Sequence, residues 1–452
     1  MQGALKETRQ PKILMCATMW WPLGARLAMA FVRYGCSVSA VCPPGHPLRF
    51  ISGIASLYSY KRLGSAASLK AAILSASPDL IVPCDDGVVW QLHELHANNP
   101  ELQGLIERSL GAKDNYPRLQ KRGEVLQAAA ELGIHTPFTQ SVTSVEDLKG
   151  WGVDSPAVLK LDGTWGGEGV VIARTQEWAI AAFRRLSRPM SAYLAWKRLL
   201  INRDPLALWS WRRRTKSSVT VQEFIQGRPA NTMIACWNGD VLAVVTAEVL
   251  ASQGATGAAT AVRLVHNDEI ERASHLLARR FKLSGFHGLD FILEEVSGTA
   301  YLIELNPRCT QLGHLNLPPQ GDLAGAICSK LGGNANSELL SKMWPERSGI
   351  GSTVAFFPQA LKWNPKSEHL HRGFHDIPWE ELELVQELLG RPWPERQWLS
   401  RIYHHFRTAK RPDEVTFAGK ISAEKPAIER YSSSLDGELQ AAEFGEKTAV
   451  NR

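Results

Sequence analysis

The chain has 452 residues, which predicts two or three domains, and its hydrophobic (44%) and charged (21%) fractions are those of an ordinary globular protein. Its net charge of +6 suits an anionic substrate such as a nucleotide and does not by itself indicate a nucleic-acid-binding protein. The seven cysteines form no CxxC pair, residues 1–12 lack a signal-peptide pattern, and no apolar run could span a bilayer. These features argue against a zinc site or a transmembrane segment and predict a cytoplasmic protein with reduced thiols.

Apolar strands alternate with helices in the first 90 residues. Strands are predicted at residues 12–17, 37–42 and 79–83, and helices at residues 23–35 and 66–75. This alternation predicts a right-handed parallel α/β unit. Because it contains no GxGxxG motif, we do not predict a dinucleotide site.

Two short segments follow strands of this unit. Ligands of open α/β sheets bind beyond the carboxyl ends of the strands, so residues 18–21 and 84–86 are candidates for contacting a substrate. Asp85 and Asp86 have an alternative role as N-caps of the next helix.

Basic and glycine-rich positions follow. Lys121 and Arg122 open a helix over residues 121–133. Lys160 ends the strand at residues 157–161 and precedes a turn rich in glycine, which lets consecutive backbone N–H groups approach phosphate oxygens closely. The glycines of this turn are Gly163, Gly166, Gly167 and Gly169. The alternatives are basic residues on a solvated helix end and a plain hairpin.

Residues 187–218 combine many Lys and Arg residues with three tryptophans and a single Asp204. Such a segment can form a surface for RNA, anionic lipid or an acidic substrate. The alternative is an insertion whose aromatic side chains pack locally.

A β-hairpin with acidic residues inside apolar strands is predicted at residues 289–305. Burying the carboxylate of Asp290 or Glu304 costs roughly several kcal/mol unless another group pairs with it. Two carboxylates on neighbouring strands also repel each other. A divalent cation between them removes both problems. Asn306 lies on the same side of the chain as Glu304 and adds a neutral oxygen, so the three residues form a hard oxygen site that suits Mg²⁺. The alternative is a surface hairpin with incidental charges.

Taken in order, these patterns resemble the ATP-grasp superfamily over about residues 12–330. The resemblance implies an α/β protein with a Rossmann-like N-terminal domain followed by a two-lobed α+β ATP-grasp domain. We place the Rossmann-like domain at residues 1–112 and the ATP-grasp domain at residues 113–335, with a small lobe at about residues 137–227. Residues 336–410 would form a C-terminal extension, and residues 411–452 a disordered tail.

The resemblance also implies roles for individual residues. ATP is the expected nucleotide, with Mg²⁺ (or Mn²⁺) held by Asp290, Glu304 and Asn306. Lys160, the glycine turn and either Lys121 or Arg122 would bind the phosphates. The adenine would lie against the hinge formed by Gln222, Glu223, Phe224 and Ile225.

Some positions depart from the family's pattern, and others have a role that the resemblance only suggests. Pro229 stands where many ATP-grasp proteins have a ribose-binding Glu, and Asn231 is a substitute. Arg308 would steady the reacting carboxylate, and Arg263 lies where some relatives place a basic residue against the transferred phosphate. We interpret His287 and His314 as structural or at most substrate-facing, because their neighbours are oxygen ligands for a hard cation.

The activity implied is that of an ADP-forming carboxylate–amine ligase acting on small-molecule substrates through an acyl phosphate. The alternatives are a bicarbonate-using carboxylase or carbamoyl-phosphate-type enzyme, and a non-catalytic module that binds nucleotide, or RNA or a membrane surface through residues 187–218. A homodimer is a further expectation, since dimers are common among similar proteins.

Overall fold

The computed structural model describes most of the chain. The described residues are 9–151, 155–162, 169–189, 191–198, 208, 211, 218–315, 322–333, 350–390 and 415–416. Three glycines of the predicted phosphate turn (Gly163, Gly166 and Gly167), most of the basic segment 187–218 and nearly all of the predicted tail lie outside this part.

The N-terminal part is a parallel four-stranded sheet in the order β3-β2-β1-β4. Its strands are β1 (Lys12–Cys16), β2 (Ser37–Cys42), β3 (Ile54–Ser59) and β4 (Leu80–Pro83). The helices around it are α1 (Leu23–Arg33), α2 (Ser65–Ala76), α3 (Asp86–Asn98), α4 (Gln103–Leu110) and α5 (Tyr116–Leu119). After β3 the chain crosses to the far side of β1, so the strand order reverses between β1 and β4.

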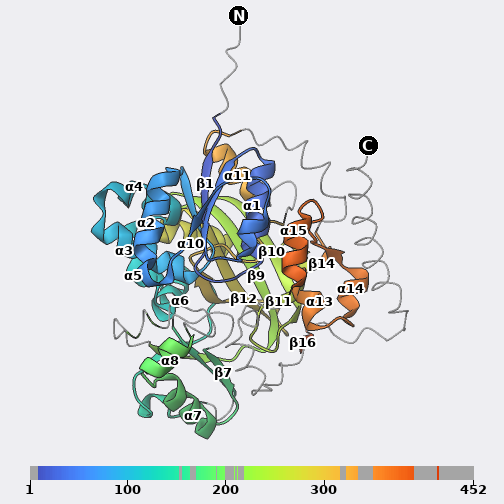
Figure 1. The fold of residues 1–452 in the computed structure, drawn as a ribbon. Coiled ribbons are helices and arrows are strands. Elements are labelled where there is room, and N and C mark those ends of the chain that lie inside the picture. Colours follow the sequence, from blue (N-terminus) through green and yellow to red (C-terminus); the bar gives the residue numbers. More distant parts are fainter. Residues whose placement is uncertain are drawn as a thin grey trace, which may run out of the picture.

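A small antiparallel sheet in the order β5-β8-β6-β7 follows, and Figure 1 shows it beneath the rest of the molecule. Its strands are β5 (Thr139–Val142), β6 (Ala157–Leu161), β7 (Val170–Ala173) and β8 (Val219–Glu223). α6 (Arg122–Glu131) precedes this sheet, α7 (Gln176–Leu186) packs on it through Ala179, Ala182 and Phe183, and α8 (Ala192–Lys197) follows.

The central sheet runs in the order β13-β12-β9-β10-β11-β14-β15. Its long strands are β9 (Gly227–Trp237), β10 (Asp240–Ser252), β11 (Ala259–Val265), β12 (Gly285–Glu294) and β13 (Ala300–Asn306). β9 and β10 form a hairpin because Asn238 and Gly239 both take the positive φ angles of a tight two-residue turn. α10 (Asp268–Phe281) covers the sheet with Ile270, Ala273, Leu277 and Phe281, which recur at helical spacing, and Asn267 caps its first turn.

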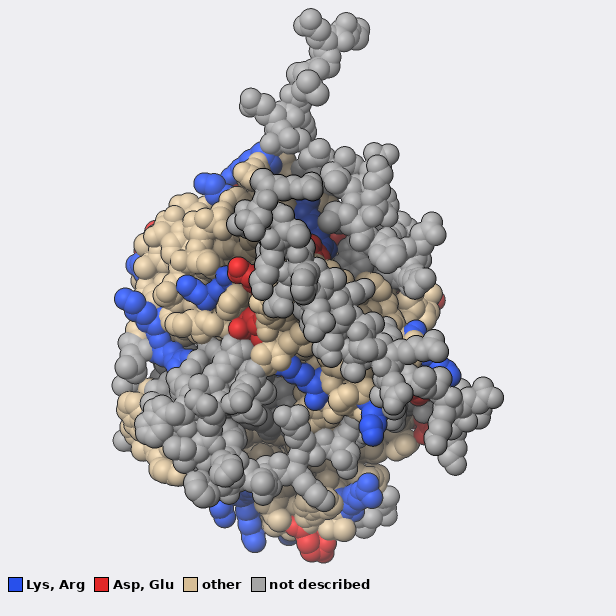
Figure 2. Space-filling model, turned by 45° about the vertical axis from the view of Figure 1, so that its right-hand side comes forward, with Lys and Arg blue, Asp and Glu red and all other residues tan. Residues whose placement is uncertain are grey.

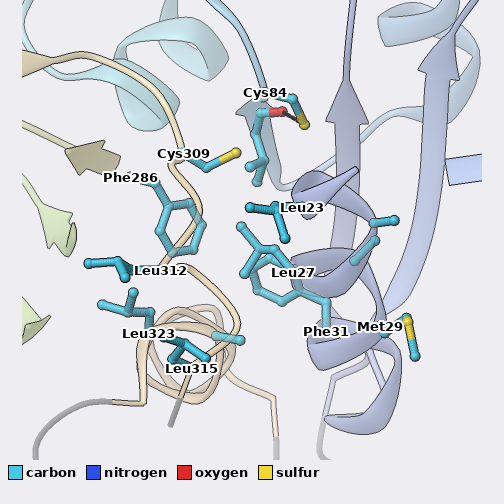
Figure 3. Close-up of a cluster of buried hydrophobic side chains, with 14 of the residues drawn as sticks. Leu23, Leu27, Met29, Phe31, Cys84, Phe286, Cys309, Leu312, Leu315 and Leu323 are labelled. Carbon is cyan, nitrogen blue, oxygen red and sulfur yellow. Dashed lines mark hydrogen bonds between the residues drawn. The ribbon is translucent and has the colours of Figure 1, made fainter. Parts of the chain in front are cut away.

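The N-terminal sheet and the central sheet share one hydrophobic core. In Figure 3, Leu23, Leu27 and Phe31 of α1 face Phe286 of β12 and the leucines at positions 312, 315 and 323. The rings of Phe31 and Phe286 meet edge to face, with 5.9 Å between their centroids. This core holds the carboxyl end of the parallel sheet next to the carboxyl end of β13.

The C-terminal part adds β14 (Thr353–Ala355), β15 (Phe374–His375), α13 (Gln359–Trp363), α14 (Glu368–Arg372) and α15 (Leu382–Leu389) at the far edge of the central sheet (Figure 1). β16 (Val415–Thr416) pairs with the end of β10. The predicted fold class, an α/β chain that begins with a parallel sheet, is confirmed. In the part of the chain that the structure describes, no helix has the length and apolar character needed to cross a membrane.

Candidate active site

A cavity of about 790 Å³ is lined by residues of the small sheet and the central sheet and by segments that follow two strands of the N-terminal sheet. The small sheet and the hinge after it form one wall, β9, β12 and β13 form another, and the loops after β1 and β4 close one end. Ten of the predicted site residues that the structure describes line it, namely Arg122, Lys160, Gln222, Glu223, Phe224, Ile225, Asp290, Glu304, Asn306 and Arg308.

Two carboxylates lie opposite each other on neighbouring strands of this cavity. Asp290 of β12 pairs in register with Glu304 of β13, next to a β-bulge between Asp290 and Phe291. Asp290 accepts hydrogen bonds from Nδ2 of Asn231 (2.6 Å) and of Asn306 (3.0 Å). Burial, and then the charge of Glu304, raise the pKa of Asp290 to about 6. A positive charge placed beside Asp290 would therefore favour its ionised form.

Arg122 meets Glu304 directly. Its Nη2 lies 2.5 Å from Oε1 of Glu304 and its Nη1 lies 3.3 Å from Oδ1 of Asp162. Burial alone would raise the pKa of Glu304, but Arg122 and then Lys160 outweigh it and lower that pKa. The side chain of Lys121, by contrast, is 61% exposed and pairs with Glu124. Of the two basic residues that the sequence left open, only Arg122 lines the cavity.

Lys160 lies at the inner end of β6. It is buried, and its Nζ donates to the carbonyl of Ile303, the residue before Glu304, at 3.4 Å. Burial, and next the charge of Arg122, lower the pKa of Lys160 to about 8. Lys160 and Arg122 thus bring two cationic groups to the carboxylate pair from two different elements.

Arg308 joins the hairpin to the N-terminal sheet. Its Nε lies 3.0 Å from Oδ2 of Asp86, and its Nη2 donates to Oδ1 of Asn306 at 3.3 Å. Burial would lower the pKa of Arg308, but the carboxylate of Asp86 raises it instead. Asp85 has the helix-capping role that the sequence offered, because its side chain accepts from the backbone N–H of Val88.

The hinge residues Gln222, Glu223, Phe224 and Ile225 border an apolar slot in the cavity. Val158 of β6, Ile172 of β7, and Phe291 and Ile303 of the hairpin line the same slot. Nε2 of Gln222 donates to Oγ1 of Thr139 at 3.1 Å, which fixes that side chain. The hinge thus lies beside apolar side chains that line the same cavity.

Several expected residues have other surroundings. Arg263 lies outside the cavity lining, and its guanidinium pairs with Glu248, so the structure does not bring it to the site. Asn231 lines the cavity and its Nδ2 donates to Asp290, so it lies beside the carboxylates. Gly169 ends the glycine turn, where its carbonyl accepts from the backbone N–H of Leu161.

His287 and His314 are both structural. Nε2 of His287 contacts the carbonyl of Ser284 at 2.9 Å, and burial lowers its pKa to about 4. His314 contacts Asp376 at 2.8 Å. Arg174, just after β7, also lines the cavity and was missed from the sequence because it carries no motif.

The donor set at the carboxylate pair suits a hard divalent cation. The carboxylates of Asp290 and Glu304 face each other there, and carboxylate oxygens are ligands that a hard cation prefers. Arg122 occupies Oε1 of Glu304, so Oε2 is the oxygen that a cation would use. Asp290, Glu304 and Asn306 therefore fit Mg²⁺.

Comparisons with known proteins agree with this geometry. Residues 208–311 match the family model of an ATP-grasp domain. The fold is similar to N5-carboxyaminoimidazole synthase from Aspergillus clavatus in complex with ADP and 5-aminoimidazole ribonucleotide (15% identity, TM-score 0.52, covering 76% of this chain and 80% of that one). It is also similar to N5-carboxyaminoimidazole synthetase from Staphylococcus aureus complexed with ADP (14% identity, TM-score 0.51, covering 72% of this chain and 79% of that one).

A third similar structure is biotin carboxylase from Campylobacter jejuni in complex with β,γ-ATP (12% identity, TM-score 0.50, 72% of both chains). No curated protein sequence matches the chain. The resemblance inferred from the sequence is thus confirmed, and the protein has the fold of the ATP-grasp superfamily, with an ATP-grasp domain that includes residues 208–311.

Proposed function

We propose that the protein is an ATP-dependent ligase that joins a carboxylate to an amine and releases ADP. The observation that carries this proposal is the placement of Asp290 opposite Glu304 in the same cavity as Lys160, Arg122 and Arg308. A protein that only binds nucleotide has no need for two carboxylates that face each other in its cavity. A phosphoryl-transfer site needs them to position a cation, together with basic groups that neutralise the phosphates.

The reaction divides into two balanced steps. An oxygen of the substrate carboxylate attacks the γ-phosphorus of ATP, and the bond between that phosphorus and the β,γ-bridging oxygen breaks to give an acyl phosphate and ADP. The amine nitrogen then attacks the acyl carbon, the carbon–oxygen bond breaks, and phosphate leaves as the nitrogen loses a proton. Both steps depend mainly on positioning and charge neutralisation.

Residues of this chain supply those two effects. Lys160 and Arg122 bind phosphate oxygens, and Arg308 orients the substrate carboxylate. Asp290, Glu304 and Asn306 would hold Mg²⁺ (or Mn²⁺), which supplies neutralisation of phosphate charge when it is bound. The apolar slot along the hinge binds the adenine. The nucleotides named for similar folds, ADP and β,γ-ATP, support a nucleotide in this cavity.

The test is release of ADP and phosphate from MgATP by the full chain with paired libraries of carboxylates and amines, bicarbonate included. We expect at least one pair to stimulate ATP cleavage, and Glu304→Gln to abolish that stimulation. Glu131→Gln, a change at an exposed residue of α6, should leave it unchanged. A response to bicarbonate alone would favour the carboxylase alternative. If no pair stimulates cleavage and Glu304→Gln has no effect, the ligase proposal is wrong.

A further inference from the structure

The end of the cavity next to the parallel sheet has its own lining. The strand order reverses between β1 and β4, and ligands of open α/β sheets bind beyond the carboxyl ends of the strands at such a point. Met19, Trp20 and Trp21 follow β1 and line the cavity. Asp86 follows β4 and lines it as well.

Hydrogen bonds hold these loops together. The carboxylate of Asp85 accepts from the backbone N–H of Thr18 (2.6 Å) and of Met19 (3.2 Å). The backbone N–H of Cys309 donates to the carbonyl of Pro83 at 3.0 Å. The aromatic loop, the start of α3 and the segment that carries Arg308 are therefore fixed relative to one another before any ligand arrives.

The charged groups at this end are of opposite sign. Asp86 and Arg308 lie 3.0 Å apart, and both line the cavity. Asp86 would repel a ligand with only a negative charge, although Arg308 would attract it. Arg308 would likewise repel a ligand with only a positive charge, although Asp86 would attract it. A zwitterion can match both, with its carboxylate toward Arg308 and its ammonium group toward Asp86.

Uncharged polar atoms at the same end lack partners. Nε1 of Trp20, Oγ1 of Thr310 and Oε1 of Gln311 are buried without a hydrogen bond to any described residue, and their residues all line the cavity. Buried polar groups are normally paired, so each exception calls for an explanation. A ligand with both donors and acceptors would give these atoms partners after small side-chain rotations.

We propose that this end of the cavity binds an α-amino acid with a large apolar side chain as the carboxylate substrate of the ligase. Its carboxylate faces Arg308, which is two residues from Asn306, and its ammonium group lies near Asp86 and Oε1 of Gln311. Its side chain packs against Met19, Trp20 and Trp21. This inference rests on the proposed function for the reaction, but binding of the amino acid can be measured without it.

The test is isothermal titration calorimetry of the full chain with phenylalanine, leucine, tryptophan and glycine, each with and without the non-hydrolysable ATP analogue AMPPNP and Mg²⁺. Phenylpropionate and phenethylamine, which lack the amine and the carboxylate, complete the set. We expect at least one of the three apolar amino acids to bind about tenfold more tightly than glycine, and phenylalanine more tightly than either single-charge analogue.

Variants of the aromatic loop locate the binding. Trp20→Ala and Trp21→Ala should each weaken amino acid binding about tenfold and leave AMPPNP binding unchanged. The matched control is Trp178→Ala, because Trp178 is half exposed on α7 and lies outside the cavity lining. Asp86→Asn should weaken phenylalanine binding without weakening phenylpropionate binding.

The outcomes separate this inference from the proposed function. Equal binding of glycine and all three apolar amino acids, or unchanged binding in both tryptophan variants, overturns the amino acid site even where AMPPNP binds. Amino acid binding that depends on Trp20 and Trp21 supports the site even where AMPPNP fails to bind, and the failure of AMPPNP then counts against the ligase.

Discussion

Lys121 and Arg122 are adjacent in the sequence and chemically alike, yet they differ in burial. Arg122 is in contact with Glu304 inside the cavity, and Lys121 is exposed beside Glu124. We expect Arg122→Gln to weaken MgAMPPNP binding about tenfold or more, because a charged hydrogen bond to phosphate contributes about 1.5–3 kcal/mol. Lys121→Gln is the control and should change it less than about twofold. Calorimetric titration measures both, and equal effects would contradict the assignment of Arg122.

A buried histidine predicts how stability depends on pH. Nδ1 of His46 accepts from the backbone N–H of Leu48 at 3.1 Å, and burial lowers the pKa of His46 from 6.5 to about 3. As the pH falls below 6.5 the unfolded chain takes up a proton that the folded chain does not, so stability is lost from that point down to about pH 3. His46→Asn keeps an acceptor for Leu48 and removes this titration.

The measurement is the free energy of unfolding in urea at about pH 7 and about pH 4.5. We expect the loss between the two to be about 2–3 kcal/mol smaller in His46→Asn than in the unchanged chain, since each pKa unit corresponds to about 1.4 kcal/mol. Identical losses would mean that His46 takes up its proton at the same pH in the folded protein as in the unfolded chain.

What the sequence predicts at the residue scale depends on the backbone that carries each side chain. Asp290, Glu304 and Asn306 lie in regular strands, where the twofold period fixes which side chains share a face, so their placement in one cavity followed from spacing. Lys121 and Arg122 lie at a helix start, where one step along the chain turns a side chain from the cavity to solvent. Arg263 is on a strand whose facing direction no motif fixed.

Among the elements, β9 is restricted by close backbone packing at its start. Gly227 opens this strand beside Glu294 of β12, and a Cβ atom there would lie 2.1 Å from the backbone oxygen of Leu293. Gly227→Ala must therefore push β9 and β12 apart at the edge of the cavity, and we expect it to lower the free energy of unfolding by about 1–3 kcal/mol.

The control is Gly104→Ala on α4, where a Cβ atom would meet nothing within 4 Å. That change should be neutral or should stabilise the protein by about 0.5–1 kcal/mol, because alanine favours the helix. Urea unfolding at one pH compares the two variants. A Gly227→Ala protein as stable as Gly104→Ala would show that β9 and β12 can separate there without loss.

The elements that the sequence analysis found or missed differ in their burial pattern. β1, β2 and β4 are largely apolar and buried, and strands were predicted at all three places. β3 was not predicted, because it is an edge strand with mostly exposed residues and no continuous apolar run. Edge strands are set by their neighbours more than by their own sequence, which is why spacing did not reveal it.

At the scale of the whole molecule, the charges of the described residues on one face can be compared with those in the cavity. Figure 2 shows the Lys and Arg side chains of the coloured surface in separate groups with Asp and Glu beside several of them. The positive groups that matter for the proposed reaction lie inside the cavity instead, where Lys160, Arg122 and Arg308 surround the carboxylate pair. The small net charge is therefore a poor guide to the site.

The C-terminal part is fixed to α1 by a buried ionic network. Nη1 of Arg26 lies 2.7 Å from Oδ2 of Asp376, and the same oxygen lies 2.8 Å from Nε2 of His314. Oδ1 of Asp376 accepts from the backbone N–H of Phe357 at 2.6 Å. The side chain of Asp376 is 1% exposed and that of Arg26 is 4% exposed, so neither charge is compensated by water.

Asp376→Asn leaves the Arg26 charge buried without a carboxylate, and we expect it to lower the free energy of unfolding by about 3–5 kcal/mol. The ion pair between Arg33 and Glu380 joins the same two parts of the chain, but Glu380 is 43% exposed there, so Glu380→Gln should cost less than about 1 kcal/mol. Urea unfolding followed by far-UV circular dichroism and by tryptophan fluorescence measures both variants.

Because the network joins α1, the segment after β13 and residues 350–390 through one shared carboxylate, the two probes should report a single transition in the unchanged chain. Equal small losses in both variants would mean that water reaches Arg26, and separate transitions would mean that residues 350–390 unfold without the rest.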